Sequence, residues 1–500
     1  MKIKYLILVI IILIIILSVA VMSGMLNSKK DKYKDVKVLK DSPFTTSFFE
    51  AGMAVNFTED DWKEELKEWK EMNLQYIVIG ETAYCDNGKW YTYYPSKISG
   101  TTMNYDSVDI ILKHCKEANM KFFICGGNNP SPANLCKHDK DNNGKGQESF
   151  IESIKSTLPF AEELYNKYYK EYKDLWYGWY FSPEISNNID WENSEYFKIG
   201  VQTLSDSLNI CLDKYRSFNK NFTIMLSPYL NLDEKATWVT KDANVIKKYW
   251  TEVINNTNFK ENDVLAPQDC VDNYNWDYQK LEKFTKVYRD AISESNKNIK
   301  LWMNLLIAIG SDGSETSKYT DLAQTTYINR MIKQIDTEKQ YVDGFMSFSF
   351  CYYLSKPNNI AGYYNTYKDY LQYGIIDVQD PKAPNSLSVG TITINQKNTL
   401  NIKFSGMDDD YGIARAVIYK NGKEFTYRTA TRLASTYNGE RVGNQYPNQF
   451  FDTEFNLDND QATYKIVVYD CSENKSKDSL DFTVTSKNGK ISYEIIKSSN

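Results

Sequence analysis

Carboxylate side chains follow four of the apolar runs in this sequence, and two suitably placed carboxylates can hydrolyse a glycosidic bond. They are Glu50, Glu81, Glu184 and Asp269. In such a pair, one carboxyl protonates the leaving oxygen while the other attacks the sugar or activates water. We predict Glu184 as the general acid/base and Asp269 as its partner. Glu81 and Glu50 are predicted to bind substrate, with Glu81 as the alternative catalytic group.

The elements that must position these residues alternate regularly between residues 42 and 377. Short apolar runs suited to buried parallel strands occur near residues 45–51, 76–80, 121–125, 177–181, 222–226, 264–266, 301–306 and 344–350. Helical periodicity lies between them. Trp62, Leu66, Trp69 and Met72, for example, share one helical face behind the expected N-cap Thr58. Eight such alternations predict a (β/α)8 TIM barrel. The rival doubly wound sheet would carry a glycine-rich turn after its first strand, where Phe49–Met53 is not one.

A TIM barrel carries its functional residues at the carboxyl ends of its strands. The remaining predicted substrate contacts at those ends, or in the loops beyond them, are Gln268, Asn304, Trp179, Tyr229 and Trp90. Aromatic rings there could stack on the C–H face of a sugar. The structural alternatives are that Glu184 and Asp269 cap the helices that follow them, and that the aromatic cluster around Trp90 forms a small loop core.

Three motifs in order resemble a bacterial family of glycoside-hydrolase-like TIM-barrel domains of unknown function. They are Trp176–Ile185, Leu226–Tyr229 and Val264–Asp269. The resemblance covers about residues 42–375 and implies a carbohydrate-directed barrel without naming a substrate. In that family the last motif typically continues with Gly, where this sequence has Cys270.

Other kinds of chemistry have little support. A net charge of −6 argues against binding nucleic acid. The eight cysteines are scattered without a C-x-x-C pair, so a zinc site is not expected. Asp139–Gly144 resembles the start of a calcium loop, but Phe150 stands where a bidentate Glu is required. Neither His114 nor His138 lies at a strand end. We therefore predict no metal and no cofactor.

The two ends of the chain predict further segments. Residues 1–30 contain a long apolar run and read as a membrane anchor or signal segment, and residues 31–41 as a spacer. The TIM-barrel domain is predicted over 42–377. After Asp380–Pro384 the pattern alternates with a period of two, so residues 381–488 predict a β-sandwich resembling immunoglobulin or fibronectin-III modules, with 489–500 as a tail.

These inferences combine into one functional hypothesis. We expect a membrane-tethered, extracytoplasmic glycoside hydrolase that acts on a cell-surface or extracellular polysaccharide. Secretion after signal cleavage is the alternative location. The alternative function is a non-catalytic barrel that binds glycan or scaffolds other surface proteins. The sequence indicates neither the sugar nor the oligomeric state.

The apolar run from Tyr5 to Met22 generates the first prediction. Because it nearly matches the thickness of a bilayer core, the protein should remain in the membrane fraction after high-salt washing. N-terminal sequencing of the mature protein checks this. A mature chain that begins near residue 24 would contradict the anchor and indicate a secreted protein.

Overall fold

The computed structural model describes most of the chain beyond the predicted anchor. The described residues are 33–497 except 50, 130–144, 190–192, 233–235, 272–276, 310–323, 326–327, 358–360, 378, 385, 395–398, 408–411, 430–435, 438–439, 442–448, 457–460, 478 and 488–489. Glu50, His138 and the calcium-like segment Asp139–Gly144 therefore lie outside the described part.

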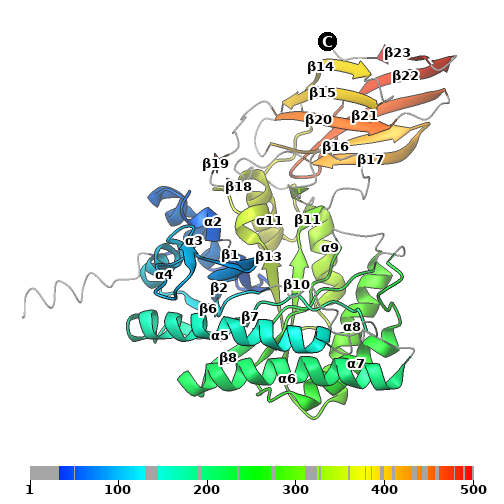
Figure 1. Ribbon diagram of the computed structural model, residues 1–500. Helices are drawn as coiled ribbons and strands as arrows, with labels where there is room; N and C mark the ends of the chain where they lie inside the picture. The colour runs from blue at the N-terminus through cyan, green and yellow to red at the C-terminus, as the bar shows by residue number, and fades with distance from the viewer. Residues whose placement is uncertain are drawn as a thin grey trace, which may run out of the picture.

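Eight parallel strands close into a barrel, as the sequence predicts (Figure 1). In their order around the barrel they are β1 (Phe44–Phe49), β2 (Tyr76–Ile79), β6 (Lys121–Cys125), β7 (Trp176–Phe181), β8 (Thr223–Leu226), β9 (Val264–Leu265), β10 (Lys300–Leu306) and β13 (Gly344–Phe348). The last strand pairs with the first, with Ser47 opposite Ser347. This closure brings the carboxyl ends of all eight strands to one end of the barrel, which we call the mouth.

A long helix follows each barrel strand and covers the outside of the barrel. In chain order these helices are α3 (Glu59–Glu71), α4 (Ser107–Ala118), α5 (Lys145–Tyr172), α6 (Ser194–Phe218), α7 (Ala243–Asn256), α8 (Tyr278–Glu294), α9 (Ile328–Glu338) and α11 (Ala361–Tyr373). The first begins with the expected capping box. The amide of Asp61 donates to Thr58 Oγ1, and the amide of Thr58 donates to Asp61 Oδ2.

Large side chains fill the barrel interior, so the barrel is a packed core and not a pore. The buried members of this inner cluster are Phe48, Tyr76, Val78, Phe123, Cys125, Tyr180, Met225, Val264, Ala266, Trp302 and Met346. Phe48 and Tyr180, at the mouth end, meet edge to face with ring centroids 5.1 Å apart. The residues that follow the strands, above these two rings, are therefore the ones that can face a ligand at the mouth.

Short elements decorate the connections at the mouth. They are the helices α2 (Ala51–Ala54) and α10 (Phe350–Tyr353), the three-stranded sheet β3 (Ala83–Asp86), β4 (Lys89–Thr92) and β5 (Thr101–Met103), and the pair β11 (Ala308–Ile309) and β12 (Gln324–Thr325). They come directly after β1, β13, β2 and β10, respectively. The loops at this end are thus more elaborate than a minimal barrel requires.

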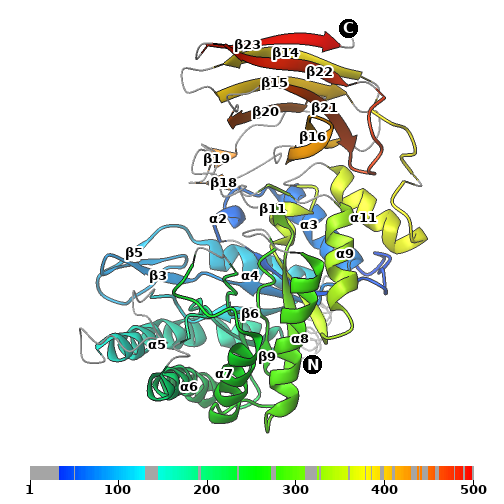
Figure 2. The same cartoon turned by 90° about the vertical axis from the view of Figure 1, so that its right-hand side faces the viewer.

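The C-terminal part forms two antiparallel sheets beyond the barrel (Figures 1 and 2). One sheet contains β14 (Ser386–Ile394), β15 (Thr399–Met407) and β20 (Gln449–Asn456). The other contains β17 (Lys423–Thr429), β16 (Ile413–Lys420), β21 (Ala462–Asp470), β22 (Leu480–Lys487) and β23 (Lys490–Lys497). A small pair, β18 (Thr436–Tyr437) and β19 (Glu440–Arg441), lies apart, and β18 contacts α2. Between β16 and β17, Asn421 and Gly422 both have positive φ, as a tight hairpin turn requires.

The junction between barrel and sandwich is not a bare linker. The Tyr363 hydroxyl of α11 donates to the carbonyl of Ala414 at 3.1 Å, and Tyr363 is buried. Asn474 Nδ2 likewise donates to the carbonyl of Asp380. In addition, β23 falls within residues 489–500, which we predicted to be a tail. In the part of the chain described by the structure, no helix has the length and apolar character needed to cross a membrane, and residues 1–30 lie outside that part.

A buried network ties α3 to the segment that follows β13. Trp69 Nε1 donates to Glu65 Oε1 at 2.5 Å, and the amide of Lys356 donates to Glu68 Oε2 at 3.0 Å. Ser355 also hydrogen-bonds Glu65. Burial raises the pKa of Glu65 to about 7. The segment after the last barrel strand is therefore held by buried carboxyl groups, and the folded state favours the protonated form of Glu65.

The substitution Glu65→Gln should change how stability depends on pH. In the unfolded chain this carboxyl has an ordinary pKa near 4.5 and in the fold about 7. The stabilisation that protonated Glu65 contributes is therefore complete below its unfolded pKa. It is lost as the pH rises through its folded pKa, which lowers the free energy of unfolding by about 3 kcal/mol. Urea unfolding should find the variant more stable than the parent at pH 8 but not at pH 4.5. An equal difference at both pH values would contradict this.

Candidate active site at the barrel mouth

Glu184 stands in the loop after β7 with its side chain exposed at the mouth. Gln268, which follows β9, donates from Nε2 to Glu184 Oε1 at 3.1 Å. The same amide lies 3.5 Å from the carbonyl of Ser227, after β8. One glutamine thus links the carboxyl ends of three adjacent strands and orients the carboxylate.

Gln268 is itself held from both sides by neighbouring strands. The backbone N–H of Gln268 donates to the carbonyl of Pro228 at 2.9 Å. The backbone N–H of Asn304 donates to the carbonyl of Pro267, also at 2.9 Å. Asn304 is buried, and its Nδ2 donates to Ser227 Oγ at 3.1 Å. Asn304, which we predicted to contact substrate, therefore braces the strand ends from within the barrel.

Glu81 follows β2 and is half-buried at the same end. The hydroxyl of Tyr93 hydrogen-bonds its carboxyl. Burial raises the pKa of Glu81 above its ordinary value, and the Tyr93 hydrogen bond offsets only part of that rise. Glu81 is therefore a carboxyl whose surroundings favour the protonated form. The sheet β3–β5 supplies this surrounding, because Tyr93 directly follows β4.

Glu81 and Glu184 come from alternate strands of the barrel, β2 and β7, with β6 between them. The chain at the end of β6 contacts the neighbours of both. Cys125 is close enough to Glu81 for the carboxylate to affect its pKa. Ser182, two residues before Glu184, donates from Oγ to the carbonyl of Gly127 at 3.0 Å. The two carboxyls thus belong to one continuous group of strand ends.

Asp269 points away from this group. It is buried, and its Oδ1 accepts from the amide of Leu306 at 3.0 Å while its Oδ2 accepts from Gln334 Nε2 of α9 at 2.7 Å. Burial raises its pKa to about 6, although these hydrogen bonds and the charge of Arg330 act in the opposite direction. Both carboxylate oxygens are occupied by protein donors beneath the loop. This geometry argues against the predicted catalytic role and gives Asp269 a structural one.

The turn directly after Asp269 has an unusual backbone conformation. Cys270 has φ 54°, a left-handed conformation that glycine adopts most easily. This is the position at which the resembling family typically has Gly. The Cys270 thiol accepts a hydrogen bond from the amide of Leu230 at 3.4 Å and lies 3.5 Å from the carbonyl of Gln268. Before this turn the chain is extended, since Gln268 forms a parallel β-bridge with Asn304, so Gln268 faces Glu184 and the next side chain, Asp269, faces α9.

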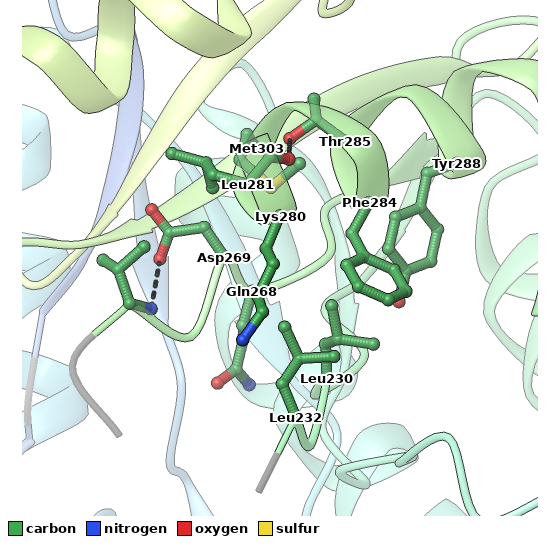
Figure 3. A pocket seen from close by; sticks show the side chains of 11 residues that line it. Leu230, Leu232, Gln268, Asp269, Lys280, Leu281, Phe284, Thr285, Tyr288 and Met303 are labelled. Carbon is green, nitrogen blue, oxygen red and sulfur yellow. Dashed lines mark hydrogen bonds between the residues drawn. The ribbon is translucent and has the colours of Figure 1, made fainter. Parts of the chain in front are cut away.

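A pocket of about 300 Å³, partly open to solvent, lies between this loop and α8. Its walls are mostly apolar and are formed by Leu230, Leu232, Gln268, Asp269, Val271, Lys280, Leu281, Phe284, Thr285, Tyr288 and Met303. In Figure 3 the Asp269 carboxylate lies on one side of the pocket and the Phe284 and Tyr288 rings on the other. Because Gln268 lines it, the pocket adjoins the mouth.

The aromatic residues predicted to bind sugar are distributed differently. Trp179 is fully buried and stacks on Tyr215 of α6 with centroids 4.5 Å apart, so it cannot contact a substrate. Strand alternation turns it outward, toward the helices. Trp90 packs against Phe160 of α5 at 4.3 Å, as the structural alternative predicts. Tyr229 is half-buried, and its amide ties the loop after β8 to the loop that carries Glu184.

One aromatic residue at the mouth escaped the sequence analysis. Phe348 ends β13 with 37% of its surface exposed and packs against Phe48 with centroids 5.5 Å apart. Ser347 and Ser349, on either side of it, are completely buried. Side chains alternate along a strand, and Met346 of β13 faces the barrel interior. Phe348, two residues later, could therefore have been predicted to face inward as well.

Metal binding finds no support in the described residues. They contain no group of three or more His, Cys, Asp or Glu side chains arranged to hold a metal ion. The seven described cysteines are free thiols, six of them buried.

A family comparison covers the barrel. The model of DUF4434, described as a domain of unknown function, matches residues 45–361. The chain belongs to the DUF4434 family. A search of curated proteins found no match. The family match spans every barrel strand except the first residue of β1, so the site described above lies within the DUF4434 domain.

Solved structures similar to this DUF4434 protein are glycoside hydrolases by their descriptions. A proposed α-L-fucosidase from Bacteroides thetaiotaomicron has a TM-score of 0.50 and 17% identity over 68% of this chain and 98% of that one. The intracellular xylanase TsXylA from Thermoanaerobacterium saccharolyticum, in complex with xylotriose, has a TM-score of 0.35 and 11% identity over 63% and 89%. A β-glucuronidase from Bacteroides uniformis has a TM-score of 0.32 and 10% identity over 88% of this chain and 43% of that one. At 17% identity, the likeness to the first of these structures shows a similar fold alone.

The position of Asp269 predicts that Asp269→Asn is tolerated. Gln334 Oε1 has no hydrogen-bond partner among the described residues. This Gln334 oxygen could accept a hydrogen bond from the side-chain amide that the substitution introduces. The oxygen that remains on the substituted side chain would still accept from the backbone N–H of Leu306. Turnover and thermal unfolding of the DUF4434 protein should therefore stay close to those of the parent. Asp269→Ala, which leaves buried donors unsatisfied, should cost about 2–4 kcal/mol of stability. A stable Asp269→Asn protein with turnover reduced ~10²-fold would restore the catalytic assignment.

Proposed function

We propose that this DUF4434 protein is a glycoside hydrolase whose catalytic carboxyls are Glu81 and Glu184. The observation that carries the proposal is the contrast between their surroundings at one barrel mouth. Glu81 is half-buried with a raised pKa, whereas Glu184 is exposed and oriented by Gln268. Two carboxyls in different environments are what an acid and a nucleophile or base require.

The roles follow from these environments. Glu81, whose raised pKa favours the protonated form, donates its proton to the glycosidic oxygen as the bond to the leaving sugar breaks. Glu184 supplies the carboxylate on the other side of the ring. It either attacks the anomeric carbon or removes a proton from the attacking water, depending on the separation of the two groups. Compared with the prediction from sequence, Glu184 changes from acid to carboxylate partner, and Glu81 replaces Asp269.

The rest of the mouth supports a sugar as the substrate. Phe348 offers an exposed aromatic surface above the packed interior, and the sugar's C–H face can pack on such a ring. Gln268 and Tyr93 carry polar groups next to the two carboxyls. A site that combines an apolar platform with a few fixed polar groups is typical of binding sites for small polar ligands.

The location of the enzyme belongs to the same proposal. Residues 1–30 would anchor it in the membrane, with the barrel and the immunoglobulin-like or fibronectin-III-like sandwich outside the cell. A polysaccharide at the cell surface or in the surrounding medium would then be its substrate. The sequence pattern of the anchor supports this placement.

Removing either carboxyl should abolish hydrolysis without abolishing binding. A screen of the purified protein against surface polysaccharides first identifies a hydrolysed glycan. On that glycan, Glu81→Gln and Glu184→Gln should each lower kcat by at least ~10²-fold, the usual effect of losing a positioned acid or base. Calorimetric affinity for the intact glycan should stay within a few-fold of the parent, because glutamine keeps the shape of the side chain.

Glu261→Gln is a matched control. Glu261 is also exposed and also lies beside an amide, since Asn298 Nδ2 is 3.5 Å from its Oε1, but it precedes β9 at the opposite end of the barrel. This variant should retain full activity. Unchanged turnover in Glu184→Gln would refute the assignment. Glycan binding without hydrolysis by the parent protein would favour the non-catalytic barrel instead.

A further inference from the structure

Trp238 is exposed in a loop whose other large hydrophobic side chains are not. It lies between β8 and α7, on the mouth side of the barrel, with 53% of its surface exposed. Among the described residues of that loop it is the only exposed large hydrophobic side chain. Its neighbours Ala236 and Val239 are buried, with 0% and 4% exposed. The turn is therefore packed on both sides of the ring that it holds out to solvent.

Hydrogen bonds fix this turn in place. Lys241 Nζ donates to the carbonyl of Ala236 at 2.8 Å, which closes the turn. The buried Asn187 side chain donates from Nδ2 to the carbonyls of Thr240 and Asn231, and its Oδ1 accepts from the amide of Asn231. The amide of Thr240 in turn donates to the carbonyl of Asn187 at 3.0 Å. The exposure of Trp238 is thus a property of a well-held loop.

The hydrogen bonds between Asn187 and Thr240 also limit the distance between Trp238 and the candidate catalytic residue Glu184. Asn187 is three residues after Glu184, and Thr240 is two residues after Trp238. With about 3.8 Å between successive Cα atoms and roughly 5 Å across the hydrogen-bonded pair, the Cα atoms of Glu184 and Trp238 are at most ~24 Å apart. The ring therefore lies within reach of the same glycan chain, a few sugar units from the bond at Glu184.

We propose that Trp238 is an outer sugar-binding platform, and that the substrate is therefore a glycan of several units and not a mono- or disaccharide. This inference rests on the proposed hydrolase function. A preorganised ring costs little entropy when it binds, and a sugar ring can pack flat on an indole. Because no other described large hydrophobic side chain of this loop is exposed, the ring does not belong to a contiguous apolar patch of the loop such as a protein–protein interface uses, which makes a sugar the better fit.

Binding of an oligosaccharide series tests the platform. The full-length Glu184→Gln protein is titrated calorimetrically with fragments of increasing length from the glycan identified by the hydrolysis screen. Adding Trp238→Ala should weaken binding of the long fragments about tenfold and leave the shortest bound fragment unchanged. Trp238→Phe should recover most of the loss. Thermal unfolding should not change, because the side chain is exposed.

Tyr373→Ala is the control, since Tyr373 is equally exposed at 54% but ends α11, away from the clamped loops. It should leave every affinity unchanged. Equal affinities for all fragment lengths with and without Trp238 would overturn the platform while leaving the hydrolase proposal intact. If the screen finds a hydrolysed glycan whose shortest fragment already binds as tightly as the longest, the platform is also wrong. Failure to find any bound glycan would overturn both proposals.

Discussion

Closure of eight parallel strands around a packed aromatic interior is the constraint on which the candidate site depends. Because β13 pairs with β1, side chains distant in sequence must meet at the one end where all strands finish. Phe48 and Tyr180 pack edge to face in the interior just below that end. Gln268 then connects three adjacent strand ends and delivers an amide to Glu184. The site is therefore built by the barrel framework, with loops adding Tyr93 and Trp238.

The different fates of the carboxyl groups come from small differences in backbone direction. Gln268 and Asp269 are adjacent in sequence, yet one faces Glu184 and the other is buried against α9. Gln268 forms a parallel β-bridge with Asn304, and successive side chains of such extended chain point to opposite sides. Burial alone does not make a catalytic group. Asp269 has a raised pKa, but both of its oxygens are engaged by protein donors. Glu81 has a raised pKa and lies at the mouth, only half-buried, which leaves it room to meet a substrate.

The sequence predicted the barrel well because strands buried on both faces leave continuous apolar runs, and every predicted run overlaps a barrel strand. Glu81, Glu184 and Gln268 were located for the same reason, since their position at a strand end follows from the run before them. Side-chain direction was harder to predict. Trp179 was assigned to the mouth although strand alternation turns it outward, and Phe348 was overlooked beside two buried serines. The conformation of Cys270 could not be foreseen, because the loop alone sets it.

The central claim is that a glycan binds between Glu81 and Glu184 at the barrel mouth. The most direct measurement is a crystal structure of the Glu184→Gln protein in complex with the glycan identified by screening. The account predicts a sugar ring at the mouth, with its glycosidic oxygen within hydrogen-bond distance of the Glu81 carboxyl and its anomeric carbon facing position 184. A glycan bound only on the C-terminal sandwich, or one that leaves Glu81 without contact, would contradict it.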